Sequence, residues 1–176
     1  MKKKIIASML GILLVPLALT GCGTQKNIIG ENDAPKITYV VAGGDIGIFE
    51  VYVLTQDYTL KRYDMSLDYF HKYDVFVGEL PPEGEYRVTE YQIFKEDWNA
   101  LINAINENNF AELPEELSGD FATDGTDYYV QVETADWTHK TGGYLAGYGE
   151  DEANKRFNAI QRELNNITHP YPMPVE

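Results

Sequence analysis

The chain has 176 residues, of which 28 are acidic and 14 are basic, so its formal net charge at neutral pH is −14. A hydrophobic content of 44%, with 13 tyrosines and 7 phenylalanines, excludes a wholly disordered chain. The acidic excess argues against binding nucleic acid and against adsorption to anionic lipid, because both depend on clustered positive charge.

The N-terminus combines a basic stretch with an apolar one. Met1–Lys4 contains three lysines, and Ile5–Leu19 is apolar but too short to span about 30 Å of hydrocarbon as a helix, which is typical of a signal peptide. The stretch ends at Leu19-Thr20-Gly21-Cys22, which resembles the lipobox of bacterial lipoprotein precursors. This resemblance implies that residues 1–21 are removed, that Cys22 carries a diacylglyceryl thioether, and that a fatty acid such as palmitate can acylate the new amino group.

Cys22 is the only cysteine, so no intramolecular disulfide is possible. Residues 22–36 are mostly polar and predict a lipidated tether that reaches on the order of 20 Å. We therefore expect a protein held at the extracytoplasmic face of the cell membrane by the lipid on Cys22. Loss of Lys2, Lys3 and Lys4 with the signal peptide leaves 11 basic residues against 28 acidic ones, a net charge of −17.

The first part of the body reads mostly as β-strand. Alternating and β-branched residues, separated by turn residues, predict strands over 37–41, 47–54, 58–63 and 86–93, with a weaker one over 74–77. In the strand over 86–93, Tyr86 and Val88 share one face whereas Tyr91 and Ile93 share the other. This change of phase predicts a β-bulge near Thr89–Glu90.

Two helices and a hairpin are predicted next. An apolar stripe at helical spacing predicts a helix over 95–109, formed by Phe94, Trp98, Leu101, Ile102 and Ile105. Residues 127–134 alternate as a strand, and Ala135-Asp136 predicts a two-residue turn into a strand over 137–144, which places His139 opposite Val132 on the core side. A second amphipathic helix is predicted over 151–167, followed by a Pro-rich tail, 169–176.

These elements predict one α+β domain over 37–168, with a mostly antiparallel sheet of about 5–7 strands and two amphipathic helices packed on one face. The stretch from Trp98 to Leu164 also resembles uncharacterised lipoproteins of Gram-positive bacteria. The resemblance lies in Trp98-x-x-Leu-Ile, Phe110-x-x-Leu-Pro, Asp124-Gly-Thr and His139-Lys140. It implies no activity and no site residue.

An acidic loop precedes the hairpin. Asp120, Asp124 and Asp127 are the residue types that bind calcium. However, Ala122 stands where the EF-hand pattern needs an oxygen ligand, and Gln131 stands where it needs a bidentate glutamate. Asp-Gly before an alternating strand is foremost a turn signal. A turn is therefore the leading interpretation, and a calcium site is the alternative.

Catalytic and metal-binding motifs are sparse. Beyond the signal peptide the serines are Ser66 and Ser118, and neither lies in a hydrolase motif. The histidines lack the His-x-x-x-His spacing of a zinc site, and there is no glycine-rich phosphate loop. We therefore predict no cofactor and no enzymatic activity, with a cell-envelope hydrolase as an alternative.

Tyrosine is the conspicuous surplus, and tyrosine is enriched at recognition surfaces. We predict a candidate binding surface that contains Tyr129, Tyr144, Tyr148 and Trp137, and we expect 142–149 to be its most flexible segment. The alternative is that these rings fill the core and its rim. The sequence thus predicts a membrane-anchored, non-catalytic binding module for an envelope protein, peptide or glycan, with a small-ligand or calcium-binding lipoprotein as the alternative.

Overall fold

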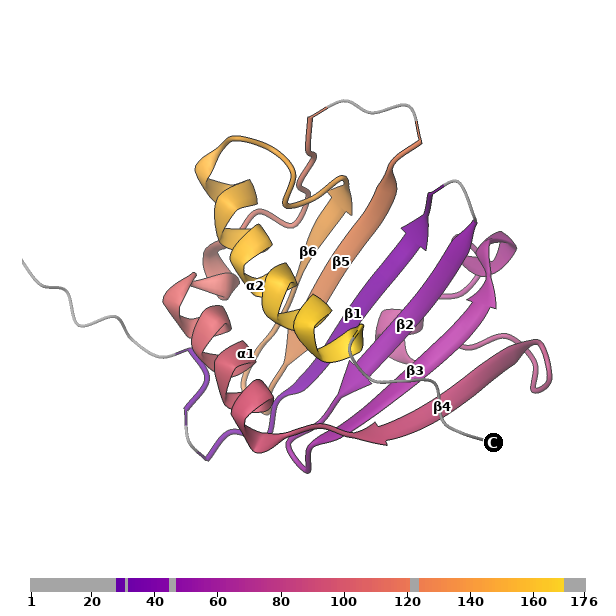
Figure 1. Cartoon of the computed structure of the whole chain (residues 1–176), viewed down its shortest axis with the longest axis horizontal. Helices are drawn as coiled ribbons and strands as arrows, with labels where there is room; N and C mark the ends of the chain where they lie inside the picture. The colour runs from indigo at the N-terminus through magenta and orange to yellow at the C-terminus, as the bar shows by residue number, and fades with distance from the viewer. Residues whose placement is uncertain (1–27, 31, 45–46, 121–123, 170–176) are drawn as a thin grey trace, which may run out of the picture.

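A six-stranded sheet carries two helices on one face (Figure 1). The computed structural model describes residues 28–30, 32–44, 47–120 and 124–169. The strands lie in the order β4-β3-β2-β1-β5-β6, and all neighbouring pairs are antiparallel, which confirms the predicted α+β fold. The elements are β1 (Lys36–Gly43), β2 (Ile48–Leu54), β3 (Thr59–Ser66), β4 (Tyr86–Gln92), α1 (Lys95–Glu107), β5 (Thr126–Glu133), β6 (Thr138–Tyr144) and α2 (Glu152–Thr168).

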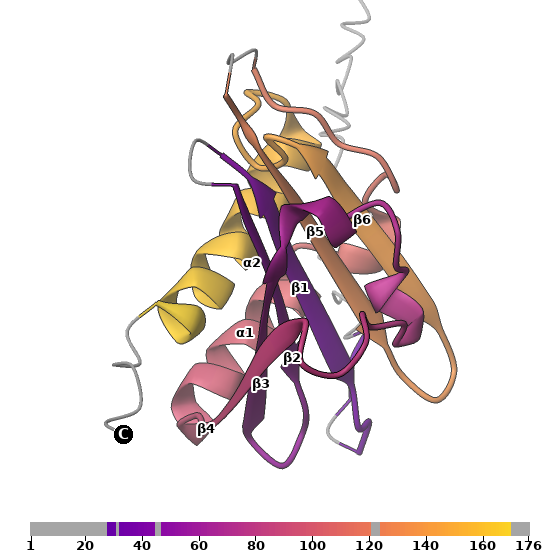
Figure 2. The same cartoon turned by 90° about the vertical axis from the view of Figure 1, so that its right-hand side faces the viewer.

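Because side chains alternate along the strands, the sheet has an apolar core on each face. On the helix face, the strands pack against the apolar stripes of α1 and α2 through buried residues that include Ile37, Tyr39, Leu54, Val130, Leu101, Ile105, Phe157, Ile160 and Leu164. The opposite face, called the outer face below, buries Val40, Phe49, Val51 and Met65. The connection from β3 to β4 covers part of it and contains two short 3-10 helices, η1 (Leu67–Tyr69) and η2 (Val75–Val77) (Figure 2).

Two predictions about the β3–β4 region are wrong. Residues 75–77 form η2 rather than a strand, because the Asp74 side chain accepts a hydrogen bond from the Phe76 N–H at 3.1 Å and Gly78 ends the turn with a φ of +88°. The β-bulge is absent from β4, which pairs with β3 residue for residue. The change of phase arises because β4 has apolar contacts on both faces, with Tyr86 in the outer core and Tyr91 in the helix-side core.

The hairpin of β5 and β6 confirms the predicted two-residue turn. The Thr134 N–H donates to the Trp137 carbonyl at 2.9 Å, and His139 lies opposite Val132. The His139 ring is half-buried, 5.3 Å from the ring of Phe110, and its Nε2 is 2.9 Å from the Leu113 carbonyl oxygen. The predicted core position of this histidine is therefore correct.

The expectation of flexibility over 142–149 is wrong at its start, since Gly142 and Gly143 are buried inside β6. Residues 115–119 run along this strand, with hydrogen bonds between Leu117 N–H and the Gly142 carbonyl and between Gly119 N–H and the Tyr144 carbonyl. The close approach explains the glycines, because a Cβ at position 142 would collide with the carbonyl oxygen of Tyr128.

The fold extends further towards the N-terminus than the predicted domain boundary. Ile29 is only 3% exposed, and the buried Asn106 of α1 accepts hydrogen bonds from the N–H groups of Ile28 and Ile29, both at 2.9 Å. The Asn106 amide also donates to the Ile29 carbonyl at 3.1 Å. The described residues of 28–35, called the strap below, therefore belong to the domain, which shortens the predicted tether.

The ends of the two helices also refine the predictions. Phe94 belongs to the predicted stripe but is the N-cap residue of α1 and is 69% exposed. Arg156 of α2 donates to the carbonyls of Asn108 and Asn109, which follow α1, so the second helix satisfies acceptors at the end of the first. None of the helices in the described ranges is long and apolar enough to cross a membrane.

Candidate functional site

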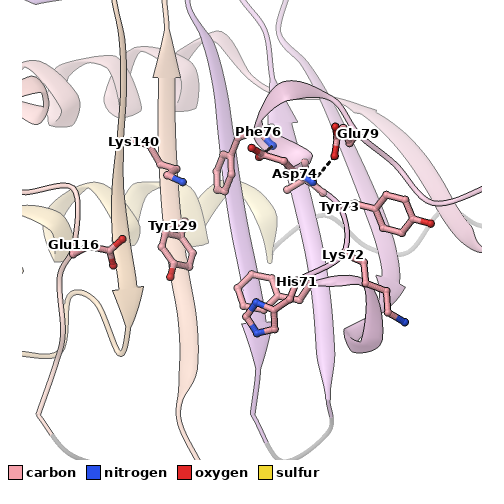
Figure 3. A pocket seen from close by; sticks show the side chains of 11 residues that line it. His71, Lys72, Tyr73, Asp74, Phe76, Glu79, Glu116, Tyr129 and Lys140 are labelled. Carbon is pink, nitrogen blue, oxygen red and sulfur yellow. Dashed lines mark hydrogen bonds between the residues drawn. The ribbon is translucent and has the colours of Figure 1, made fainter.

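The outer face carries a cleft of about 410 Å³ between the β3–β4 connection and the hairpin of β5 and β6 (Figure 3). Its volume falls within the range of small-ligand pockets. The lining residues come from one continuous segment, from the 115–119 segment and from the two strands: Phe70, His71, Lys72, Tyr73, Asp74, Val75, Phe76, Glu79, Glu116, Tyr129 and Lys140.

Three aromatic rings form the apolar part of the cleft. Tyr129 on β5 lies 6.2 Å from Phe76 and 6.3 Å from Phe70, measured between ring centroids. Tyr129 pairs with Gly142 on β6, so its direct partner on that strand has no side chain to cover its ring. The Gln131 amide donates to the Phe76 carbonyl at 3.2 Å and so ties η2 to β5. The sheet and η2 thus hold the rings of Tyr129 and Phe76 in a fixed arrangement.

Lys140 brings a positive charge over these rings. Its ammonium nitrogen lies 4.8 Å from the centroid of Phe76 and 6.0 Å from that of Tyr129, both within cation–π range. Figure 3 shows the side chain reaching from β6 towards the two rings. Lys140 takes part in none of the ion pairs formed within the described ranges. Its charge is therefore available to a ligand that carries an anionic group.

The acidic groups of the cleft divide into two kinds. Asp74 and Glu79 accept hydrogen bonds from backbone N–H groups of the connection, and so they stabilise its shape. Glu116 lines the cleft, and Asp127 lies on the same face of β5 as Tyr129. Burial raises the pKa of the Asp127 carboxyl above its ordinary value, while the positive charge of His71 opposes this rise and the negative charge of Glu116 adds to it.

The structure does not gather the four predicted aromatic residues on one surface. Tyr129 lines the cleft, and Tyr144 lies on the same face, where its hydroxyl accepts a hydrogen bond from the Gly125 N–H at 2.9 Å. Tyr148 instead packs against Tyr128, with ring centroids 5.7 Å apart, on the helix side. Trp137 stands at the other end of the hairpin and donates to the Ile28 carbonyl. The candidate surface therefore reduces to the neighbourhood of Tyr129.

The acidic loop is only partly described. Asp120 and Asp124 are exposed and flank residues 121–123, which lie outside the described ranges, whereas Asp127 is half-buried on β5. Among the residues that the structure describes, no group of three or more His, Cys, Asp or Glu side chains is placed to hold a metal ion. The calcium alternative stays a prediction from the sequence.

The described ranges do not include Cys22, the signal peptide or the tail beyond residue 169.

Several residues of the candidate site were not predicted from the sequence. Tyr129 was expected at a binding surface, but Phe76 was placed in a strand, and nothing in the sequence indicated that Lys140 approaches it. Asp74 and Gly78, which flank 75–77, are the local signal that indicates a capped turn there.

No protein-family model matches the chain, and no curated protein matches it either.

Proposed function

We propose that this protein is an extracytoplasmic lipoprotein, anchored through an acylated Cys22, that binds an envelope protein or peptide in the cleft of its outer face. The single observation that carries the proposal is the cleft itself, where three aromatic rings and the ammonium of Lys140 meet on a face that neither helix covers. The lipobox supports the location, and the cleft supports binding.

The chemistry of the cleft favours a peptide segment with an apolar side chain next to a carboxylate. The rings of Phe70, Phe76 and Tyr129 offer apolar area for the side chain, and aromatic residues dominate the binding energy of many interfaces. Lys140 offers three N–H donors to the carboxylate in a partly apolar setting, where charge-assisted hydrogen bonds are strong.

Binding rather than catalysis is proposed because the described lining of the cleft lacks the nucleophile of the common covalent hydrolases, although it does contain carboxylates, lysines and a histidine. Among the described residues that line it there is no serine, threonine or cysteine. Ser66 accepts a hydrogen bond from the Asp68 N–H at the start of η1 and so has a structural role.

Site-directed photo-crosslinking in intact cells tests the proposal. A photoreactive benzoylphenylalanine replaces either Val77, which is 71% exposed next to Phe76, or Tyr148, which is 54% exposed on the helix side. We expect a discrete protein or peptide adduct from position 77 that is absent from position 148. The same adduct should disappear when Phe76→Ala and Lys140→Ala are added. Identical adducts from both positions, or no adduct from position 77, contradict the proposal.

A further inference from the structure

A second cleft, of about 590 Å³, is lined by residues of the strap, of α1 and of the turn between β2 and β3. Figure 1 shows the course of these three segments. This cleft does not share a lining residue with the cleft on the outer face. Its walls are formed by Ile29, Gly30, Asp33, Pro35, Gln56, Tyr58, Lys95, Trp98, Asn99, Ile102, Asn103 and Asn106. The strap therefore forms one wall of this cleft and α1 forms another.

Most of the polar side chains that line this cleft are primary amides, and three of them form no hydrogen bond to another described residue. Gln56, Asn99 and Asn103 are exposed, and none of the three side chains makes a hydrogen bond to another residue in the described ranges. Each primary amide offers two donors and one carbonyl acceptor. Such a mixture matches hydroxyl groups, which also donate and accept, better than it matches a bare anion or a bare cation.

The charge of the lining points to a neutral ligand. Within a protein that carries a large acidic excess, the described residues that line this cleft include one carboxylate, Asp33, and one ammonium, Lys95. Asp33 already accepts a hydrogen bond from the Gly30 N–H at 2.7 Å, so part of its capacity serves the strap. Neither sign of charge is in excess, and a charged ligand would gain little here.

Tyr58 provides an aromatic wall at a conformational cost. Its φ is +64°, in the left-handed region that suits glycine or asparagine and that a bulky side chain occupies only under strain. The turn holds it there through hydrogen bonds from the Tyr58 N–H to the Thr55 carbonyl and from the Ile93 N–H to the Tyr58 carbonyl. Its ring meets Trp98 edge to face, with centroids 6.3 Å apart. The strained backbone thus holds an aromatic ring in the wall of the cleft, where a ligand can pack against it.

We propose that this cleft binds a neutral sugar, whose hydroxyl groups pair with the amides of Gln56, Asn99 and Asn103 and whose C–H face packs on Tyr58. The proposal is independent of the peptide cleft. If Cys22 is anchored, the five residues between it and Ile28 place the cleft near the membrane, within a reach of about 20 Å. The sugar can therefore belong to a soluble wall glycan or to the headgroup of a glycolipid.

The first test titrates the full protein, purified from membranes in a detergent that contains no sugar, with N,N′-diacetylchitobiose, maltose and cellobiose by isothermal calorimetry. We expect saturable binding of at least one disaccharide. Asn103→Ala should weaken it tenfold or more, whereas Asn158→Ala, an exposed asparagine of α2 outside the cleft, should leave it unchanged. Both changes replace an exposed helical asparagine with alanine, so they share the effect on helix propensity.

Tyr58 separates binding from folding. Tyr58→Asn removes the ring but keeps a residue that adopts positive φ readily, so the protein should stay folded and lose sugar binding tenfold or more. Tyr58→Phe keeps the ring and should retain binding. Phe76→Ala, in the other cleft, should not affect it. Absence of saturable binding to all three sugars, or binding indifferent to Asn103→Ala and Tyr58→Asn, overturns the proposal.

A second arm identifies the source of the sugar. The lipidated protein is placed in vesicles of phosphatidylglycerol, with or without diglucosyl diacylglycerol, and the affinity for the soluble disaccharide is measured again. A decrease of threefold or more caused by the glycolipid shows that a headgroup occupies the cleft. An unchanged affinity, with binding still dependent on Asn103, assigns the cleft to soluble glycans.

Discussion

Asp127 shows how one residue near the cleft makes stability depend on pH. Its folded pKa is raised by burial, so the folded protein binds the proton more tightly than the unfolded chain does. The resulting stabilisation is complete below the ordinary pKa of 3.8 and is lost as the pH rises through the folded pKa. At neutral pH the ionised carboxylate therefore opposes folding.

Asp127→Asn should raise the melting temperature at pH 7, because the amide has the shape of the carboxyl without its charge. The gain over the wild type should shrink towards about pH 3, where the wild-type carboxyl is protonated. Thermal unfolding by circular dichroism at several pH values measures both effects. Asp136→Asn, at an exposed turn residue, is the control. An equal gain at pH 7 and pH 3 shows that the charge of Asp127 has no part in it.

Gly142 illustrates a different constraint on a single residue. It has a φ of +149°, and a Cβ would collide with the carbonyl oxygen of Tyr128 in β5. Gly142→Ala should therefore reduce the free energy of unfolding by about 3 kcal/mol, since the neighbouring atoms are backbone and cannot move aside. Gly78→Ala is the matched control, because Gly78 also has positive φ but has nothing within 4 Å of its Cβ position.

The Gly78→Ala control should lose only about 1 kcal/mol, the cost of the left-handed conformation itself. Urea denaturation of the two variants gives the comparison directly. Equal losses would show that backbone conformation, rather than the collision with Tyr128, explains Gly142.

At the scale of elements, the strap depends on one side chain of α1. Asn106 serves two N–H donors and one carbonyl of Ile28 and Ile29. Asn106→Ala removes these partners, so the strap should separate from the helix, with a loss of about 2 kcal/mol in unfolding free energy. Hydrogen exchange at the Ile28 and Ile29 amides should accelerate at least tenfold. Asn103→Ala, one turn earlier on the same helix, is the control. Unchanged exchange at Ile28 and Ile29 in Asn106→Ala would contradict the proposed role of Asn106 in holding the strap.

The elements also show what the sequence could predict. The strands of the hairpin and both helices follow from local periodicity, since alternation and helical spacing are properties of neighbouring residues. The bulge in β4 was wrongly predicted because this edge strand has apolar contacts on both faces. Its apolar residues therefore change from one face to the other without any insertion in the strand. The docking of Ile29 escaped prediction because it depends on Asn106, which is 77 residues away in the sequence.

The candidate site was less predictable than the fold, because its contacts join residues that are far apart in the sequence. Tyr129 was predicted at a binding surface because tyrosine is enriched at recognition surfaces. Phe76 and Lys140 belong to different elements, and only the tertiary fold brings the ammonium to 4.8 Å from the ring. The left-handed Tyr58 had no signal either, because a tyrosine does not by itself indicate positive φ.

At the scale of the whole molecule, the proposed anchor depends on Cys22. Replacement by Cys22→Ser should abolish incorporation of radiolabelled palmitate, because the thioether cannot form. The wild-type protein should take up the label and partition into the detergent phase of a Triton X-114 extraction. Ser8→Cys combined with Cys22→Ser supplies a cysteine outside the lipobox and is the control. Label retained after Cys22→Ser would show that the lipobox interpretation is wrong.

Charge and tether length together determine how near the anchored domain stands to the membrane. If the proposed cleavage before Cys22 removes Lys2, Lys3 and Lys4, the chain keeps 28 acidic and 11 basic residues, and an anionic bilayer then repels it. The docked strap leaves five residues between Cys22 and Ile28, which limits the separation to about 20 Å at that end. Salt should therefore draw the domain closer, as the screening length falls from about 30 Å at 0.01 M to about 10 Å at 0.1 M.

Energy transfer to a membrane dye measures this approach. Asp136→Cys introduces a reactive thiol at an exposed turn beside Trp137, and no other thiol competes once the Cys22 sulfur carries the diacylglyceryl thioether. In phosphatidylglycerol vesicles, transfer efficiency should rise as salt increases from 0.01 M to 0.1 M. In uncharged phosphatidylcholine vesicles it should stay constant. A rise of the same size in both lipids would show that the acidic charge does not hold the domain away from the membrane.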